Sequence, residues 1–436
     1  MIRFAMTFCV ALAASAANAA IDIQQVTSPG GIEAWLVEDH NIPFTALEIR
    51  VRGGAALDEP GKRGATNLMM ATLEEGAGDL DAQAFQTARE DLAAGFGFDA
   101  GDDMVSISAQ MLTDNRDEAV ALLRDAIVNP RFDQSAIDRV RQQVLSNIAS
   151  DAKSPGDIAS AAFDKAAFGD HPYGSPLSGT VESVTALTRD DIVTAHDNAL
   201  VRDRVYVGVV GDITPADLGP LLDDLLGDLP ESGPALPPEV EDMLDGGTTV
   251  IPFDTPQSVA LFGQPGLRRD DPDYMAAYVL NEILGGAGFE SRLMNEVREK
   301  RGLTYGVSTF LVPKFHADLW MGQVASSNAT VAEAIEVIRA EWARIARDGV
   351  TQEELDKIKT YLTGAYPLRF DGNAEIASIL VGMQVIDLPP EYVENRNEML
   401  AAVTLDDVNR LAATLLQPDR LHFVVVGEPE GLAAAN

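Results

Sequence analysis

Two side chains that can donate hydrogen bonds, Arg298 and Tyr305, lie seven residues apart in the segment Ser291–Gly306, SRLMNEVREKRGLTYG. Arg298 carries a rigid guanidinium fork that suits planar oxygen acceptors, and Tyr305 carries a phenolic hydroxyl. A donor pair of this kind can bind carbonyl or anionic oxygens. Spacing alone, however, favours an ordinary helix–turn–strand with a surface arginine and a half-buried tyrosine.

The elements around the pair are predicted from hydrophobic periodicity. Leu293 and Val297 recur at four-residue spacing and predict a helix that ends near Arg298. Gly302 suits the position just past a helix C-terminus, where a left-handed backbone costs least. The run 303–310 alternates as a strand does, so Tyr305 is expected to begin it. The glycine would then bring both side chains toward one place.

A glycine-rich stretch, Gly285, Gly286 and Gly288, precedes this segment and predicts a flexible loop that another backbone could approach closely. The whole stretch GGAGFESRLMNEVREKRGLTYGV resembles the second-domain signature of the insulinase (pitrilysin) family of zinc metallopeptidases, which includes the mitochondrial processing peptidase and its bacterial relatives. The resemblance implies that Arg298 and Tyr305 reach into an active site formed mainly by another domain.

The same resemblance implies where a metal centre should lie. The family carries an inverted zinc motif, H-x-x-E-H, on a helix of the first domain, with a further glutamate ligand downstream. The matching segment here is GATNLMMATLEEGAG, predicted as a helix over 64–75, and the downstream segment is VLSNI. Asn67 and Ala71 stand at the histidine positions, Met70 at the catalytic glutamate and Asn147 at the downstream ligand. Amides are neutral, weak zinc donors, so we expect no metal in this chain.

The remaining residues offer no substitute with a recognisable spacing. The five histidines are His40, His171, His196, His316 and His422, and no two lie within one helical turn. The chain also contains no G-x-S-x-G nucleophile elbow. A zinc site built from scattered histidines and acids stays open as an alternative, without spacing to support it.

An internal repeat organises the chain. VYVGVVGD at 205–212 matches LHFVVVGE at 421–428, and LTRDDI at 187–192 matches VTLDDV at 403–408, both 216 residues apart; AIDRV at 136–140 matches ELDKI at 354–358, 218 apart. The repeat predicts an α+β fold of two homologous halves, and the family resemblance implies α/β-sandwich halves forming a clamshell around a peptide-holding chamber. We predict an N-terminal domain over 20–226, a Pro/Gly-rich acidic linker over 227–247 and a C-terminal domain over 248–436.

The N-terminal sequence and the composition predict where the protein is located and which partners it does not bind. A basic start, an apolar run and small residues predict a secretory signal peptide over 1–19, cleaved after Ala19, and hence a periplasmic protein without membrane insertion. The only cysteine, Cys9, lies within that signal, so the mature chain has no thiol ligand. The net charge of −36 argues against binding nucleic acid or anionic membranes.

We therefore expect the non-catalytic subunit of a heteromeric zinc endopeptidase. A zinc-containing insulinase-family paralogue would hold the metal, and this chain would supply Arg298 and Tyr305 to the bound peptide substrate. The peptide is expected to add a strand along a sheet edge, at 103–111 or 320–324. Two alternatives remain open: a stand-alone peptide-binding or assembly protein, and an active enzyme with an unrecognised site.

Overall fold

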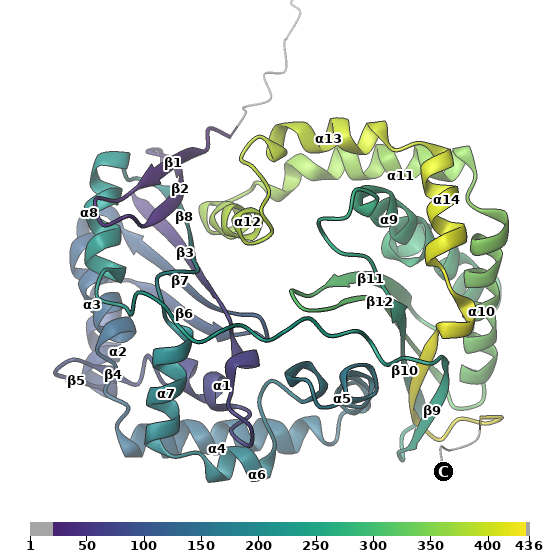
Figure 1. The fold of residues 1–436 in the computed structure, drawn as a ribbon, viewed down its shortest axis with the longest axis horizontal. Helices are drawn as coiled ribbons and strands as arrows, with labels where there is room; N and C mark the ends of the chain where they lie inside the picture. The colour runs from purple at the N-terminus through teal and green to yellow at the C-terminus, as the bar shows by residue number, and fades with distance from the viewer. Residues whose placement is uncertain (1–20, 433–436) are drawn as a thin grey trace, which may run out of the picture.

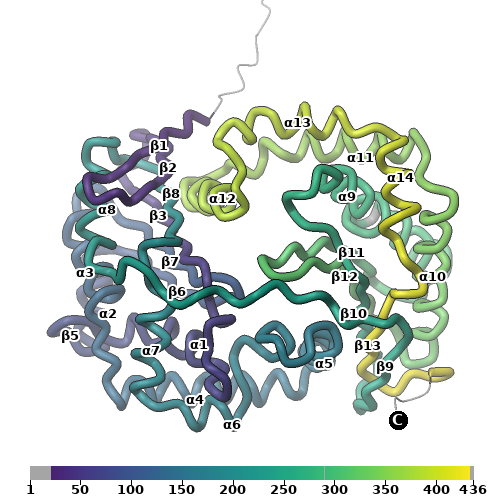
Figure 2. Tube along the Cα trace, in the orientation of Figure 1, coloured from purple at the N-terminus to yellow at the C-terminus, as the bar shows by residue number. Residues whose placement is uncertain are grey.

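A computed structural model describes residues 21–432. The predicted signal peptide, its cleavage point and Cys9 lie outside these residues. Two mixed sheets, each backed by helices, form the two halves that Figure 1 shows at left and right. Between them runs the segment 230–246, which contains no helix or strand and crosses from one half to the other in Figure 2.

The first sheet has six strands in the order β1–β2–β8–β3–β7–β6. Their bounds are β1 (Gln24–Thr27), β2 (Glu33–Glu38), β3 (Phe44–Arg52), β6 (Gly95–Ala100), β7 (Met104–Leu112) and β8 (Val205–Gly211). Strand β3 buries apolar side chains on both of its faces, so both faces of the sheet are covered. Leu47 and Ile49 point into the helical core, whereas Ala46 is buried on the opposite face.

The second sheet has five strands in the order β11–β12–β10–β13–β9. Their bounds are β9 (Gly247–Pro252), β10 (Gln257–Pro265), β11 (Val307–Pro313), β12 (Asp318–Ser327) and β13 (His422–Gly427).

The two sheets repeat one topology strand for strand. Strands β2 and β8 pair in parallel, as β9 and β13 do. The successive antiparallel pairs β8–β3, β3–β7 and β7–β6 correspond to β13–β10, β10–β12 and β12–β11. Strand β1 is an addition at the outer edge of the first sheet. The predicted two-half α+β architecture is thus confirmed.

Helices cover the outer face of each sheet and form its main core. In the first half they are α1 (Ala65–Met70), α2 (Ala82–Asp91), α3 (Arg116–Val128), α4 (Gln134–Asp151), α6 (Val181–Ala186), α7 (Arg189–Ala199) and α8 (Pro215–Leu226); in the second half they are α9 (Tyr274–Asn281), α10 (Val331–Asp348), α11 (Gln352–Ala365), α13 (Tyr392–Ala402) and α14 (Leu405–Leu415). The repeated helices α7 and α14 begin alike, with capping boxes at Thr188 and Thr404.

Two further helices are exchanged between the halves. Helix α5 (Pro155–Phe168) belongs to the first half in sequence but packs on β10 and β13 of the second sheet, where Phe163 is fully buried. Helix α12 (Asn373–Val385), which begins 218 residues later, packs on β3 and β8 of the first sheet (Figure 1). Each half therefore covers the inner face of the other with its own helix, which ties the two halves together.

The predicted peptide-binding edges are wrong. Strand β7, which contains most of 103–111, lies between β3 and β6, and β12, which contains 320–324, lies between β10 and β11. The edges at these ends of the sheets are β6 and β11. Strand β6, GFGFDA, alternates phenylalanine with glycine, and the low strand propensity of glycine is why the sequence did not predict it.

Among residues 21–432, no helix is long and apolar enough to cross a membrane.

Candidate functional site

Arg298 lies in a π-helical segment, η6 (Met294–Glu299), rather than in a regular α-helix as predicted. The wider turn shows in the bond from Lys300 N to the carbonyl of Asn295, five residues back, at 3.0 Å. Apolar spacing cannot distinguish such a turn from an α-helix. The segment ends as expected, because Gly302 has φ +66° and its N–H donates to the carbonyl of Arg298 at 2.7 Å. π-Helical segments are rare and recur at functional sites.

Tyr305 is held out into solvent by the buried residue before it. The Thr304 hydroxyl donates to the carbonyl of Ala325 at 2.5 Å and accepts from Gly306 N at 3.0 Å. Ser326 Oγ donates to the carbonyl of Leu303 at 2.6 Å. The backbone at 303–306 is thereby fixed to β12, while the Tyr305 side chain is 85% exposed.

This geometry corrects the sequence expectation, because strand β11 begins only at Val307 and Tyr305 precedes it. The half-buried tyrosine that spacing alone favoured is therefore wrong. Arg298 itself is half-buried, and its Nε lies 3.7 Å from Glu299 Oε1. The two side chains thus come from a helix end and a fixed turn joined by Gly302.

A partly buried ion pair anchors the helix that leads to Arg298. Arg292 Nε and Nη2 donate to the two carboxylate oxygens of Glu354, at 2.5 and 2.7 Å. Glu354 also caps α11 by accepting from Thr351 N at 2.8 Å. Burial alone would raise the pKa of Glu354, but the Arg292 and Thr351 hydrogen bonds outweigh it and lower the pKa to about 2. The Arg298 segment is therefore fastened to α11.

The glycine-rich stretch is more ordered than a flexible loop. Gly285 and Gly286 lie in a second π-helical segment, η4 (Glu282–Gly286), and Gly288 begins a short 3-10 turn, Gly288–Glu290. A Cβ at Gly285 would lie 2.5 Å from Thr309 Oγ1, so the close approach is to the sheet beneath. Gly288 has φ +56° and no atom within 4 Å of such a Cβ, and the approach of another backbone to this loop stays a prediction.

The positions that match the zinc motif hold no ligand set. Helix α1 ends at Met70, shorter than the predicted 64–75, and packs against α4. Met70 is buried in the core, Asn67 is half-buried and Ala71 is exposed. Asn147, exposed on α4, accepts from Gln143 Nε2 at 2.9 Å. A thioether thus occupies core volume where a catalytic carboxylate would stand.

Within residues 21–432, no group of three or more histidine, cysteine, aspartate or glutamate side chains could hold a metal ion. His171 and His316 are brought near each other by the fold, with ring centroids 6.4 Å apart. Burial lowers the pKa of both imidazoles, and the neighbouring His316 adds to the effect on His171. Both rings pack beside Tyr173 at the junction of the two halves.

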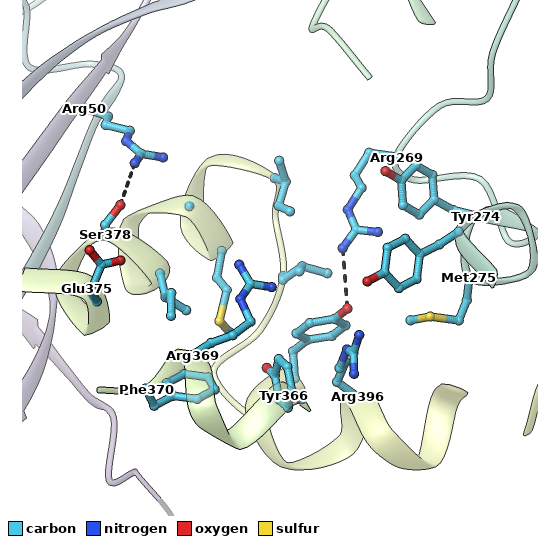
Figure 3. Close-up of a pocket in the computed structure, with 17 residues that line it drawn as sticks. Arg50, Arg269, Tyr274, Met275, Tyr366, Arg369, Phe370, Glu375, Ser378 and Arg396 are labelled. Atoms are coloured by element: carbon cyan, nitrogen blue, oxygen red, sulfur yellow. Dashed lines mark hydrogen bonds between the residues drawn. The ribbon is translucent and has the colours of Figure 1, made fainter. Parts of the chain in front are cut away.

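A pocket that sequence reasoning missed lies between α9, α12 and α13 and is rich in arginine and tyrosine (Figure 3). Its lining comes from positions between 50 and 396, so no local motif could reveal it. Residues 369–396 contain only two arginines, Arg369 and Arg396, so the local composition gives no signal of the pocket either.

The fold and the site define a class of two-half α+β proteins. The second half carries a half-buried arginine followed by an exposed tyrosine, and the first half carries a helix that matches the zinc motif but has no metal ligands at its positions. Residues 34–181 match the insulinase family (peptidase family M16), and residues 186–362 match the peptidase M16 inactive domain. This chain belongs to the insulinase family, as the resemblance predicted.

Similar proteins align with this chain over 70% or more of their length. A non-peptidase homologue, YmxG, from Helicobacter pylori is 24% identical over 392 residues, which are 89% of this chain and 90% of that one. An uncharacterized zinc protease from Mycobacterium leprae is 30% identical over 312 residues, 71% of this chain and 70% of that one. The crystal structure of a peptidase M16 inactive domain from Pseudomonas fluorescens aligns with a TM-score of 0.87 and 29% identity, covering 95% of this chain and 99% of that one.

Proposed function

We propose that this protein is the non-catalytic, substrate-binding subunit of a heteromeric zinc endopeptidase, and that it supplies Arg298 and Tyr305 to a partner's zinc site. The observation that carries the proposal is the exposed Tyr305 side chain on a backbone fixed by Thr304. Exposing a large aromatic side chain to solvent does not stabilise the fold of this chain. A hydroxyl held in a fixed position is, however, suited to donate a hydrogen bond to a substrate bound at a partner's site.

The roles follow from the chemistry of the two groups. The Arg298 guanidinium would donate to a peptide carbonyl of the substrate. The Tyr305 hydroxyl would donate to the oxyanion that forms when the partner's zinc-bound water attacks the scissile peptide. The degenerate positions Asn67, Met70 and Ala71 support assigning the metal to another chain. The relative named a non-peptidase homologue supports the same assignment.

The peptide would add a strand to a free sheet edge. The candidate edge strands are β6 in the first sheet and β11 in the second. Strand β11 is the more direct choice because it begins two residues after Tyr305. A peptide paired with β11 would pass close to the turn that carries the tyrosine.

The test is peptidase activity and zinc content of the purified mature protein, alone and mixed with a zinc-motif paralogue encoded beside it. We expect a zinc-free, inactive protein alone and activity in the mixture above that of the paralogue. Inactivity in both states would overturn the proposal in favour of a stand-alone peptide-binding or assembly protein. Zinc-dependent activity of this chain alone would overturn it in favour of an unrecognised active site.

We also propose that the protein works in the periplasm, on the basis of its N-terminal sequence. Mass spectrometry of the protein from a periplasmic fraction should give an N-terminus at Ala20. An uncleaved chain confined to the cytoplasm would contradict this location.

A further inference from the structure

A pocket of about 490 Å³ lies where the second half meets the inner face of the first sheet. It is lined by α9, α12 and α13, by the short turn Tyr366–Arg369 between α11 and α12, and by Arg50 of β3. This volume suits a small-molecule ligand. We call it the arginine pocket.

The lining is basic in a chain that is strongly acidic. Four arginines line the pocket, namely Arg50, Arg269, Arg369 and Arg396, and Glu375 is the one carboxylate among the lining residues. The whole chain has 68 acidic and 32 basic residues and is therefore negatively charged. The pocket lining, with four guanidinium groups and one carboxylate, has a net charge of the opposite sign. Local charge of this sign attracts anions.

Three of these arginines have no carboxylate partner within residues 21–432. Arg50 pairs with Glu48 at 3.3 Å, whereas Arg269 and Arg396 contact neutral groups. Arg269 Nη2 lies 3.5 Å from the Tyr392 hydroxyl, and its guanidinium stacks 4.3 Å from the Tyr274 ring centroid. Figure 3 shows Arg269, Arg369 and Arg396 extending from three different segments toward one space.

Arg396 gives the pocket its buried charge, because this residue is only 5% exposed. Its guanidinium lies 4.4 Å from the ring centroid of Tyr366. Nη1 donates to the carbonyl of Leu362 at 3.0 Å and to Asn397 Oδ1 at 3.1 Å, both neutral acceptors. Among the described residues no carboxylate lies within 4 Å of this guanidinium, and Glu282 interacts with it only over a longer distance. Burying a charge without a close counter-charge is costly, so an anion in the pocket would offset that cost.

Tyrosine hydroxyls add neutral donors to the same space. Tyr274, Tyr278, Tyr366 and Tyr392 all line the pocket. Burial raises the pKa of Tyr274, Tyr278 and Tyr366, so these hydroxyls keep their protons at physiological pH. Guanidinium forks and phenolic donors together match carboxylate and phosphate oxygens.

We propose that the arginine pocket binds a small ligand that carries two or more anionic groups, carboxylate or phosphate. The proposal is separate from the role of Arg298 and Tyr305, since it concerns other residues and its test uses no peptidase activity. At least two anionic groups are required because the three unpaired guanidinium groups come from different segments and one group could not neutralise them.

The test is isothermal titration calorimetry of the full mature protein with citrate and with pyrophosphate, at low ionic strength. The key variant is Arg369→Glu, whose parent side chain is exposed and has no ion pair to lose within the described residues. The matched control is Lys153→Glu, which makes the same change in net charge at an exposed site of the first half. We expect binding of at least one probe, weakened tenfold or more by Arg369→Glu and unchanged by Lys153→Glu.

The two probes distinguish the source of the anion. Citrate binding alone would assign a polycarboxylate, and pyrophosphate binding alone would assign a phosphate compound. No binding of either probe at millimolar concentration would overturn the proposal. Equal weakening by both variants would also overturn it, because the effect would then come from net charge and not from the pocket. Arg269→Gln, which keeps a neutral donor in the pocket, should give an intermediate loss.

Discussion

Lys314 Nζ lies 2.9 Å from Asp102 Oδ2, and this ion pair joins the turn between β6 and β7 of the first half to the turn between β11 and β12 of the second. Asp102 is held from the other side by Arg63 Nη2 at 2.6 Å. Next to it, Asp103 accepts from Phe315 N at 3.2 Å and from the Tyr173 hydroxyl. The two sheet edges proposed for peptide binding are therefore linked through their turns.

Replacing Lys314 should loosen this junction without unfolding either half. We expect Lys314→Met to cost about 1–2 kcal/mol, because the pair is partly buried but Asp102 keeps Arg63. Hydrogen exchange at the amides of Phe315 and His316 should become faster. Lys165→Met, which removes an exposed pair with Asp170, is the control and should leave these amides unchanged. Unchanged exchange in Lys314→Met would show that the pair does not hold the turns together.

Asp164 on α5 should make the protein less stable as pH rises through weakly acidic values. Burial raises the pKa of its carboxyl from 3.8 to about 6; Asp102 adds to this effect, and Lys314 and Arg63 oppose it. The folded state then binds more protons than the unfolded state between pH 4 and 6, so stability falls across this window. A rise of this size corresponds to at most about 3 kcal/mol.

The variant Asp164→Asn removes the titrating group. We expect it to be more stable than the wild type at pH 7.5 and close to it at pH 4, with a flatter pH profile between them. Urea unfolding at these two pH values measures the difference. The same pH slope in wild type and variant would mean that Asp164 is not the titrating group, and Asp318, whose pKa burial also raises to about 6, would be tested next.

Removing the Arg292–Glu354 pair should destabilise the segment that carries Arg298. We expect Glu354→Gln to cost about 2–3 kcal/mol at pH 7, because it leaves a largely buried guanidinium without its carboxylate. Since the pKa of Glu354 is lowered to about 2, its contribution is present above about pH 4.5 and is lost as pH falls toward 2. The neighbouring exposed Glu353→Gln is the control, and equal unfolding midpoints for the two variants would refute the prediction.

Two glycine substitutions in the second half should act in opposite directions. Gly285→Ala should cost about 2–3 kcal/mol, because its Cβ would lie 2.5 Å from Thr309 Oγ1 and 2.9 Å from Thr309 N. Gly364→Ala, within α11 and with no atom within 4 Å, should gain about 0.5–1 kcal/mol. Thermal unfolding should give a lower midpoint for Gly285→Ala and a higher midpoint for Gly364→Ala than for the wild type. An unchanged midpoint for Gly285→Ala would mean that the η4 turn can move away from β11.

Tyr305→Phe and Arg298→Ala should lower the peptidase rate of the reconstituted complex by about tenfold or more, with assembly unchanged. The exposed Tyr361→Phe is the matched control for loss of a tyrosine hydroxyl. Unchanged turnover in both site variants, with assembly shown by size-exclusion chromatography, would remove the role given to the pair.

The sequence by itself determined the duplicated architecture, the segment that carries Arg298 and Tyr305, and the left-handed Gly302. These features depend on local signals: repeated strand and capping patterns, a contiguous motif, and a glycine where the backbone requires one. Periodicity also located most helices, but it could not separate a π-helical turn from an α-helix at Arg298, since both bury the same apolar residues.

Only the tertiary structure decided which strands are edges, which helices are exchanged and where the arginines converge. Edge position depends on pairing between distant strands, so β6 and β11 could not be told from β7 and β12 by their own sequences. The exchange of α5 and α12 depends on which sheet offers an uncovered apolar face. The arginine pocket depends on both, because Arg50 and Arg396 line the same pocket only after α12 packs on the first sheet.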